Sequence, residues 1–225
     1  MVTHQKDDIV ERLEDFNKHV TPLSREASYD FCYGYFQTRR HHLAENIEMS
    51  CLHLWSYLAS WGMLRGSSVL LNDCSMKVLS GIIGYLDTLT DEEWELDIDD
   101  YTDEASRNKV IKIYNDISSL IEQIDVTATV TLVTKIMMGT IGCVPAIDDS
   151  LARSFREEFK ENMPLYAFRR LNKQALERFY EFYNANKDDF NAKKYPVRDF
   201  EGRELDNLFY KKAKLMDMYG WNKGN

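Results

Sequence analysis

Apolar residues recur at helical spacing along most of this chain. Val110, Ile113, Ile117 and Ile121 lie on one face of a helix expected over residues 103–124. Comparable stripes cover residues 9–20, 25–39, 43–61, 151–159, 168–183 and 205–219. Sustained alternation of apolar and polar residues, which would indicate strands, does not occur. The pattern predicts an all-α fold, a compact orthogonal bundle of about nine or ten helices.

Capping residues, glycine and proline predict where several of these helices begin and end. Thr90 is followed three residues later by Glu93, which is the pattern of a capping box, so a short helix should start there. Pro164 should end the helix that follows Pro145. Gly220 is expected to be the C-cap of the last helix, over residues 205–219.

The stretch over residues 126–147 is the most apolar in the chain. Lys135 is its only charged residue, while Asp125 precedes it and Asp148 follows it directly. We expect a buried core helix, a glycine-containing turn and the start of a second helix. A buried ammonium needs a partner, and two alternatives are open for Lys135. Its stem can lie in the core while the ammonium reaches water, or the ammonium can pair with Asp148 or its neighbour Asp149.

The net charge of −9 is unevenly distributed. Residues 87–104 contain ten Asp or Glu residues and no Lys or Arg, so removing them leaves the remainder at +1. The acidity is therefore local and does not exclude a basic face elsewhere. We expect a single helical domain over residues 1–225, either as one body or as two interlocked layers with a hinge near residues 90–104.

Cysteine usage and the absence of long apolar runs bear on the compartment. The four cysteines form no C-x-x-C pair and lie in expected helices or at their edges, which is typical of reduced thiols. The first residues are polar and resemble no signal sequence, and no window reaches the length of a membrane span. We therefore expect a cytoplasmic protein without a membrane partner.

Two features could bind anions or nucleic acid. Arg65 lies between two glycines and is followed by Ser67 and Ser68 at an expected helix start, so this loop could hold a phosphate; the alternative is a surface arginine in a helix break. Basic and aromatic residues also mix between residues 169 and 214 and could follow a nucleic-acid strand. Interleaved acids make a solvated helix face equally consistent with that second pattern.

A resemblance to a known family rests on about residues 124–155. An apolar helix with Lys135 and a glycine turn leads to Val144-Pro145-Ala146-Ile147-Asp148, which is followed after Asp149 by S-L-A-R-S-F. This order resembles the signature of helix-hairpin-helix DNA glycosylases, although the Gly-x-Gly of the hairpin is absent. The resemblance implies that Asp148 is the catalytic carboxylate, that Lys135 is its electrostatic neighbour, and that Arg65 contacts a phosphate.

Two functional hypotheses follow. The first is a DNA-glycosylase-like protein that acts in base excision, with DNA as its partner. The second is a non-catalytic helical protein that binds a protein partner or a small anionic ligand. Motifs for nucleotide cofactors and for metal ions are absent from the sequence, so we expect neither. Whether the protein is an enzyme is left open by the residues themselves.

Overall fold

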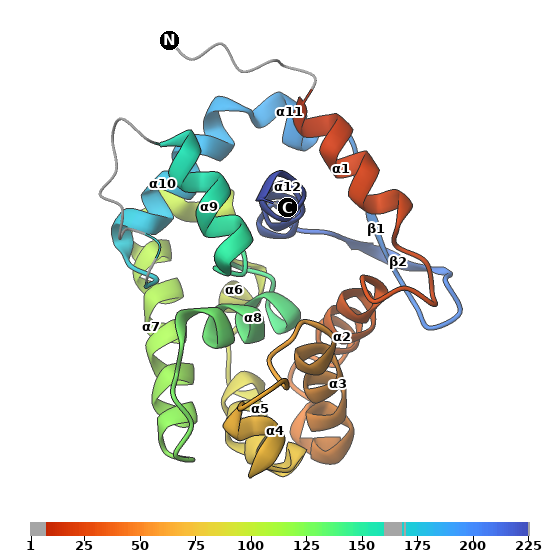
Figure 1. Ribbon diagram of the computed structural model, residues 1–225, viewed down its shortest axis with the longest axis vertical. Helices are drawn as coiled ribbons and strands as arrows, with labels where there is room; N and C mark the ends of the chain where they lie inside the picture. The colour runs from red at the N-terminus through yellow and green to blue at the C-terminus, as the bar shows by residue number, and fades with distance from the viewer. Residues whose placement is uncertain (1–7, 160–167, 169, 225) are drawn as a thin grey trace.

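The elements of the computed structural model are helices, apart from one β-hairpin (Figure 1). The structure describes residues 8–159, 168 and 170–224. The prediction of an all-α fold is confirmed, because 65% of the structure is helical and 4% is strand. The α-helices of the described residues are α1 (Asp8–Lys18), α2 (Ala27–Thr38), α3 (Ile47–Ser60), α4 (Val69–Asn72), α5 (Ser80–Asp87), α6 (Asp91–Glu95), α7 (Glu104–Glu122), α8 (Val130–Thr140), α9 (Asp149–Glu158), α10 (Lys173–Ala185), α11 (Lys187–Asn191) and α12 (Lys212–Gly224). These twelve exceed the expected nine or ten because α4, α6 and α11 are single short turns of four or five residues.

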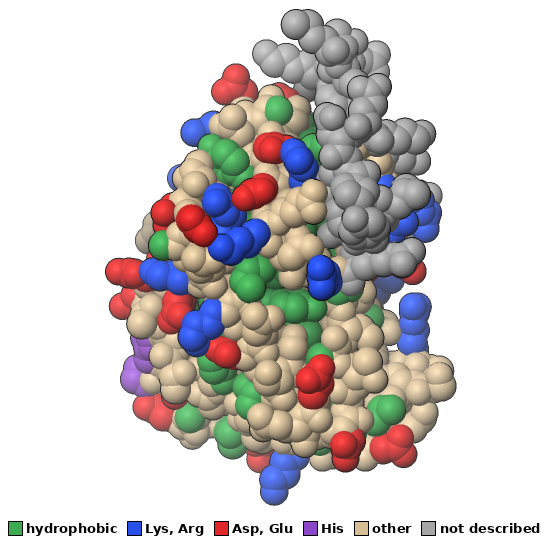
Figure 2. All heavy atoms as spheres, turned by 90° about the vertical axis from the view of Figure 1, so that its left-hand side faces the viewer, with side chains coloured by type: hydrophobic (Ala, Val, Ile, Leu, Met, Phe, Trp, Pro, Cys, Tyr) green, Lys and Arg blue, Asp and Glu red, His purple; other side chains and the backbone are tan. Residues whose placement is uncertain are grey.

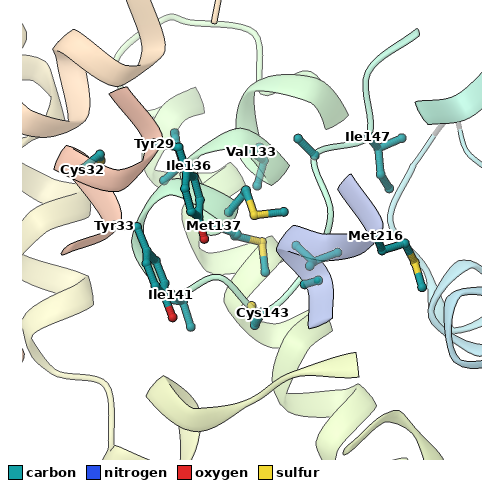
Figure 3. Close-up of a cluster of buried hydrophobic side chains, with 14 of the residues drawn as sticks. Tyr29, Cys32, Tyr33, Val133, Ile136, Met137, Ile141, Cys143, Ile147 and Met216 are labelled. Atoms are coloured by element: carbon teal, nitrogen blue, oxygen red, sulfur yellow. The ribbon is translucent and has the colours of Figure 1, made fainter. Parts of the chain in front are cut away.

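Helix α8 runs across the middle of the molecule and packs against α2, α3 and α7 (Figure 1). Its residues from Leu132 onward are buried. Figure 3 shows Ile136 and Met137 in a cluster of buried side chains that also includes Tyr29 and Tyr33. The chain then turns at Gly142, whose φ of 73° is left-handed. The predicted core helix and glycine turn are confirmed, whereas the second helix, α9, begins at Asp149, just beyond the stretch over residues 126–147.

The acidic segment is folded against the core. Its predicted capping box forms at the start of α6, where Thr90 and Glu93 bond each other's backbone N–H groups. A 3-10 helix, η3 (Ile98–Thr102), follows. Trp94, Ile98 and Tyr101 are buried, and η3 packs on α7, α10 and α12. The expected hinge in this segment stays a prediction.

The C-terminal part differs from the prediction of one helix over residues 205–219. Strands β1 (Pro196–Arg198) and β2 (Glu204–Phe209) form an antiparallel hairpin, and α12 follows it. The apolar residues of β2 are spaced as on a helix because the strand carries a bulge, and this spacing led to the wrong prediction. Pro196 pairs with Phe209 and Arg198 with Glu204, so one residue of β1 lies opposite four of β2. Asn207 takes a left-handed φ of 55° within that bulge.

The prediction that Gly220 caps the last helix is wrong. It lies inside α12, where a Cβ would approach Leu151 Cδ1 of α9 to 3.0 Å. The missing side chain therefore serves close helix packing, and Ser154 of α9 donates to the Gly220 carbonyl at 2.7 Å. The predicted helix end at Pro164 lies outside the described residues.

None of the described helices is both long and apolar enough to cross a bilayer. The four cysteines are free, and Cys32, Cys51 and Cys143 are buried. Burial raises the pKa of the Cys143 thiol to about 12, which makes its thiolate scarce at neutral pH.

Candidate functional site

Lys135 and Asp148, which the sequence predicts to be neighbours, form an ion pair. Lys135 comes from the middle of α8 and is 4% exposed, and its Nζ lies 3.3 Å from Asp148 Oδ2. Asp148 is the N-cap of α9, and its Oδ1 accepts the N–H of Leu151 at 3.1 Å. Of the two alternatives for the lysine, the structure shows the paired one. Asp149 has no such contact with Lys135 and is exposed.

A second buried ion pair lies beside the first. On α12, Lys214 Nζ lies 3.0 Å from Asp217 Oδ2, and the side chain of Lys214 is 3% exposed. The Nζ atoms of Lys135 and Lys214 lie 5.3 Å and 5.5 Å from the ring of Trp61, at the end of α3. We call these five residues the Trp61 cluster. Both ammonium groups are therefore held by a carboxylate and lie close to the same aromatic ring.

The Trp61 cluster connects four segments of the chain. Asp217 Oδ1 also accepts the N–H of Ala146 at 3.2 Å, which ties α12 to the stretch before α9. Because Lys135 and Asp148 are in direct contact, no substrate atom fits between them in this conformation. The cluster thus satisfies buried charges and joins helices. The glycosylase role of these two residues is untested by any of these contacts.

Sequence reasoning missed the Lys214–Asp217 pair, because it assigned Lys214 to a basic surface. The sequence does contain a signal. Ala213, Leu215, Met216 and Met218, which are buried, surround Lys214 and Asp217 at helical spacing. A lysine with an acid three residues later inside an apolar run is the same pattern of a buried charge and its partner that indicated Lys135.

Arg65, Ser67 and Ser68, the predicted anion loop, line one side of a hollow of about 350 Å³. The opposite side comes from the start of α8 and the residues before it, including Val126, Thr127 and Thr129. We call this cavity the Arg65 hollow. The structure therefore brings the three loop residues together with the N-terminus of α8, which the sequence analysis did not foresee. Lys135 and Asp148 are not among the lining residues.

The polar side chains of the Arg65 hollow differ in whether they already have a hydrogen-bond partner in the protein. The Ser68 hydroxyl donates to the Met63 carbonyl at 2.8 Å, and Thr129 Oγ1 accepts the N–H of Leu132 at 3.2 Å. In the described part of the chain, neither the Arg65 guanidinium nor the Ser67 hydroxyl has a hydrogen-bond or ionic partner. Arg65 and Ser67 are thus the predicted groups that could still bind a ligand.

Asp30, another buried carboxylate, holds the hairpin to α2. It is 1% exposed, accepts the N–H of Arg198 at 3.0 Å and accepts the hydroxyl of Tyr210. Removal from water raises the pKa of Asp30 to about 6, although both hydrogen bonds and nearby Lys214 favour the charged form. At neutral pH the protein therefore contains an ionised carboxylate in an unfavourable environment.

Some of the basic residues expected to form a surface between residues 169 and 214 are buried or paired with acids in the structure. Lys211 is directed inward and donates to the carbonyls of Leu96 and Ile141, at 3.1 Å and 3.0 Å. Burial lowers the pKa of its ammonium. Lys173 pairs with Glu104 at 2.8 Å, and Figure 2 shows basic and acidic side chains interspersed on that side of the molecule. On this face, basic side chains do not form a continuous track for a nucleic-acid backbone.

Comparison with known proteins adds no functional assignment. No family model, no curated protein and no solved structure matches the chain.

Proposed function

We propose that this protein is a non-catalytic binding protein that takes a small anionic ligand in the Arg65 hollow. One observation carries the proposal: among the described residues that line the hollow, Arg65 alone is charged. A guanidinium beside free hydroxyl groups is a favourable arrangement for a phosphate or carboxylate. The first turn of α8 adds the positive end of a helix dipole at the opposite wall.

The Trp61 cluster supports binding over catalysis. A reactive carboxylate needs an open position beside it for the reacting atom. In Asp148, one carboxylate oxygen instead accepts the capping N–H at the start of α9 and the other accepts from Lys135. Lys135 is in turn covered by Trp61. These contacts favour a cluster that stabilises the fold.

Titration calorimetry with inorganic phosphate tests the proposal. We expect saturable binding at one site, and Arg65→Gln should weaken it at least about tenfold, because a charge-assisted hydrogen bond contributes roughly 1.5–3 kcal/mol. Arg39→Gln is the matched control, since Arg39 is also an exposed arginine at a helix end. Binding that is absent, or equal in the wild type and Arg65→Gln, would overturn the proposal.

A second candidate, the glycosylase-like function, is favoured by one observation. Helix α7, a turn, α8, an extended stretch and a capping Asp148 follow one another in the order that the resemblance implies. Under this hypothesis the protein binds a duplex with an abasic site more tightly than an intact duplex at the same salt concentration. Asp148→Asn should lower base-excision activity by orders of magnitude. Asn preserves the cap of α9 but removes the counter-charge of Lys135, so circular dichroism must show that the variant is folded at the assay temperature. An unchanged activity, or no preference for damaged DNA, excludes it.

A further inference from the structure

The Arg65 hollow combines a polar end with an apolar wall. Its polar side chains are those of Arg65, Ser67, Ser68, Thr127 and Thr129, and its apolar side chains include Val69, Val126 and Leu132. The apolar side chains would not contribute to binding a bare inorganic anion, because such an ion has no apolar surface to bury. The composition of the walls therefore carries information about the ligand.

The polar end is ready to receive a charged group. The Arg65 side chain lies over Gly62, where a Cβ would be 3.6 Å from its Cζ atom, and Gly62 takes a left-handed φ of 77°. The Arg65 side chain therefore packs against the backbone of its own loop. Like the Ser67 hydroxyl, the Thr127 hydroxyl has no hydrogen-bond partner among the described residues. One guanidinium and two hydroxyl groups without a hydrogen-bond partner among the described residues therefore line the same hollow.

The apolar wall is partly open to water. Val69, on α4, is 41% exposed, although it lies beside Val126 and Leu132, which are each 6% exposed. A ligand that covers Val69 would remove apolar surface from water, and burial of each CH₂ group contributes about 0.8 kcal/mol. The hollow would gain affinity from any ligand with an apolar part.

The volume sets the size of that part. An apolar cavity of about 150 Å³ holds a benzene ring. The Arg65 hollow, at about 350 Å³, has space for one ring or a short alkyl chain together with a phosphate or carboxylate. It lies at the lower end of the range of small-molecule sites, roughly 300–1,000 Å³, so a large ligand would project from it.

Building on the proposed function, we propose that the ligand is a small organic anion whose charged group binds Arg65, Ser67 and Thr127 while its ring or alkyl chain covers Val69 and Leu132. This assigns a ligand class to the hollow and distinguishes it from a site for free phosphate. Affinity then has two separable parts, one from the charge and one from apolar contact.

Three probes separate the two parts: inorganic phosphate, phenyl phosphate and phenol, each titrated into the 225-residue chain at one ionic strength. We expect phenyl phosphate to bind at least about tenfold more tightly than phosphate, which corresponds to 1.4 kcal/mol, and more tightly than phenol. Equal affinity for phosphate and phenyl phosphate would overturn the inference and leave the proposed function standing. Failure of both phosphates to bind would overturn the two together.

A pair of variants on α4 locates the apolar contact. Val69→Ser should weaken the binding of phenyl phosphate by up to about fifteenfold, because two methyl groups leave the contact. Leu71→Ser is the matched control, since Leu71 is 47% exposed on the same helix and does not line the hollow. Both positions are solvent-exposed, so both variants should fold. Equal phenyl phosphate affinity in Val69→Ser and Leu71→Ser would place the ring elsewhere and refute the inference.

Discussion

Several charged side chains in the described part of the chain are almost completely removed from water, and three of them belong to residues discussed above. Asp30, Lys135 and Lys214 are 1%, 4% and 2% exposed. Burying a charge is costly unless partners compensate for the lost hydration. The two lysines each have a carboxylate and an aromatic ring close by, whereas Asp30 relies on a backbone N–H and a tyrosine hydroxyl. The residues therefore differ in how their charge affects stability.

Asp30 should make the protein more stable in mild acid. Its folded-state pKa of about 6 lies above the value near 3.9 of an unfolded chain. A raised folded pKa adds stability that is fully present below the unfolded value and is lost as pH rises through about 6. The shift of about two units corresponds to about 3 kcal/mol. Asp30→Asn should remove this dependence, because its amide can accept from the Arg198 N–H and donate to Tyr210.

Urea unfolding at pH 4.5 and 7.5 measures this effect. Relative to Asp30→Asn, the wild type should gain about 2 kcal/mol on acidification, because pH 4.5 still lies above the unfolded pKa and the full shift is not yet realised. Asp206→Asn, at an exposed position on β2, serves as the control and should track the wild type at both pH values. A difference between wild type and Asp30→Asn that is the same at pH 4.5 and 7.5 would contradict the assignment.

Lys135→Met tests the first ion pair of the Trp61 cluster. Methionine keeps the apolar stem and removes the ammonium, which leaves Asp148 without its counter-charge. We expect a loss of about 1–3 kcal/mol, less than for a fully buried pair, because the Asp148 side chain is 25% exposed. The double variant with Asp148→Asn should recover part of the loss, as denaturant unfolding of a double-mutant cycle would measure. A neutral or stabilising Lys135→Met would mean that the pair contributes nothing.

At the scale of elements, helix α8 owes its position to a residue without a side chain. A Cβ at Gly139 would come within 2.4 Å of Tyr57 Cε1, and Tyr57 is 3% exposed and cannot move aside. Gly139→Ala should therefore destabilise the protein by about 1–3 kcal/mol through overpacking, despite the better helix propensity of alanine. The free energy of unfolding in denaturant provides the measurement.

Gly84→Ala is the counterpart of this variant in α5. No atom lies within 4 Å of the position that its Cβ would take, so only helix propensity should act, with a gain of up to about 1 kcal/mol. Opposite signs at the two positions are the expected outcome. Destabilisation of equal size at both would show that the contact with Tyr57 is not the cause.

Periodicity predicted those elements whose apolar face is regular. The stripe of Val110, Ile113, Ile117 and Ile121 became α7, and the charge deficit over residues 126–147 became the buried α8. The hairpin was not predicted, because the bulge in β2 leaves Leu205 and Leu208 three residues apart, which is also the spacing of neighbours on a helix face. Local spacing cannot show whether such residues lie on a helix or on an irregular strand.

The candidate site was predictable only in its parts. A lone charge between acids indicates a partner, and a serine-rich glycine loop indicates a place for an anion. That Arg65 faces Val126 and Thr127 depends on how α4 packs beside the start of α8, which is a long-range relation. The sharing of Trp61 by Lys135 and Lys214 depends on the packing of α3, α8 and α12 in the same way.

At the scale of the whole molecule, the described residues share one buried core. It extends from Leu13 of α1 to Tyr219 of α12, and these first and last helices pack against each other. Neither half of the chain can lose its structure without exposing the core of the other. We therefore predict a single cooperative unfolding transition. In scanning calorimetry the calorimetric and van't Hoff enthalpies should agree. Two resolved transitions would instead support separate layers that meet at residues 90–104.

The bulge in the hairpin has a consequence for how copies of this protein meet in concentrated solution. A regular exposed strand offers a row of free N–H and C=O groups to which a strand of another copy can add, which leads to aggregation. In β2 the row is broken by left-handed Asn207, and the exposed Glu204 and Asp206 place negative charges along the same strand. A second copy would meet an uneven edge of like charge. The protein can thus extend a hairpin from its helical body without polymerising through it.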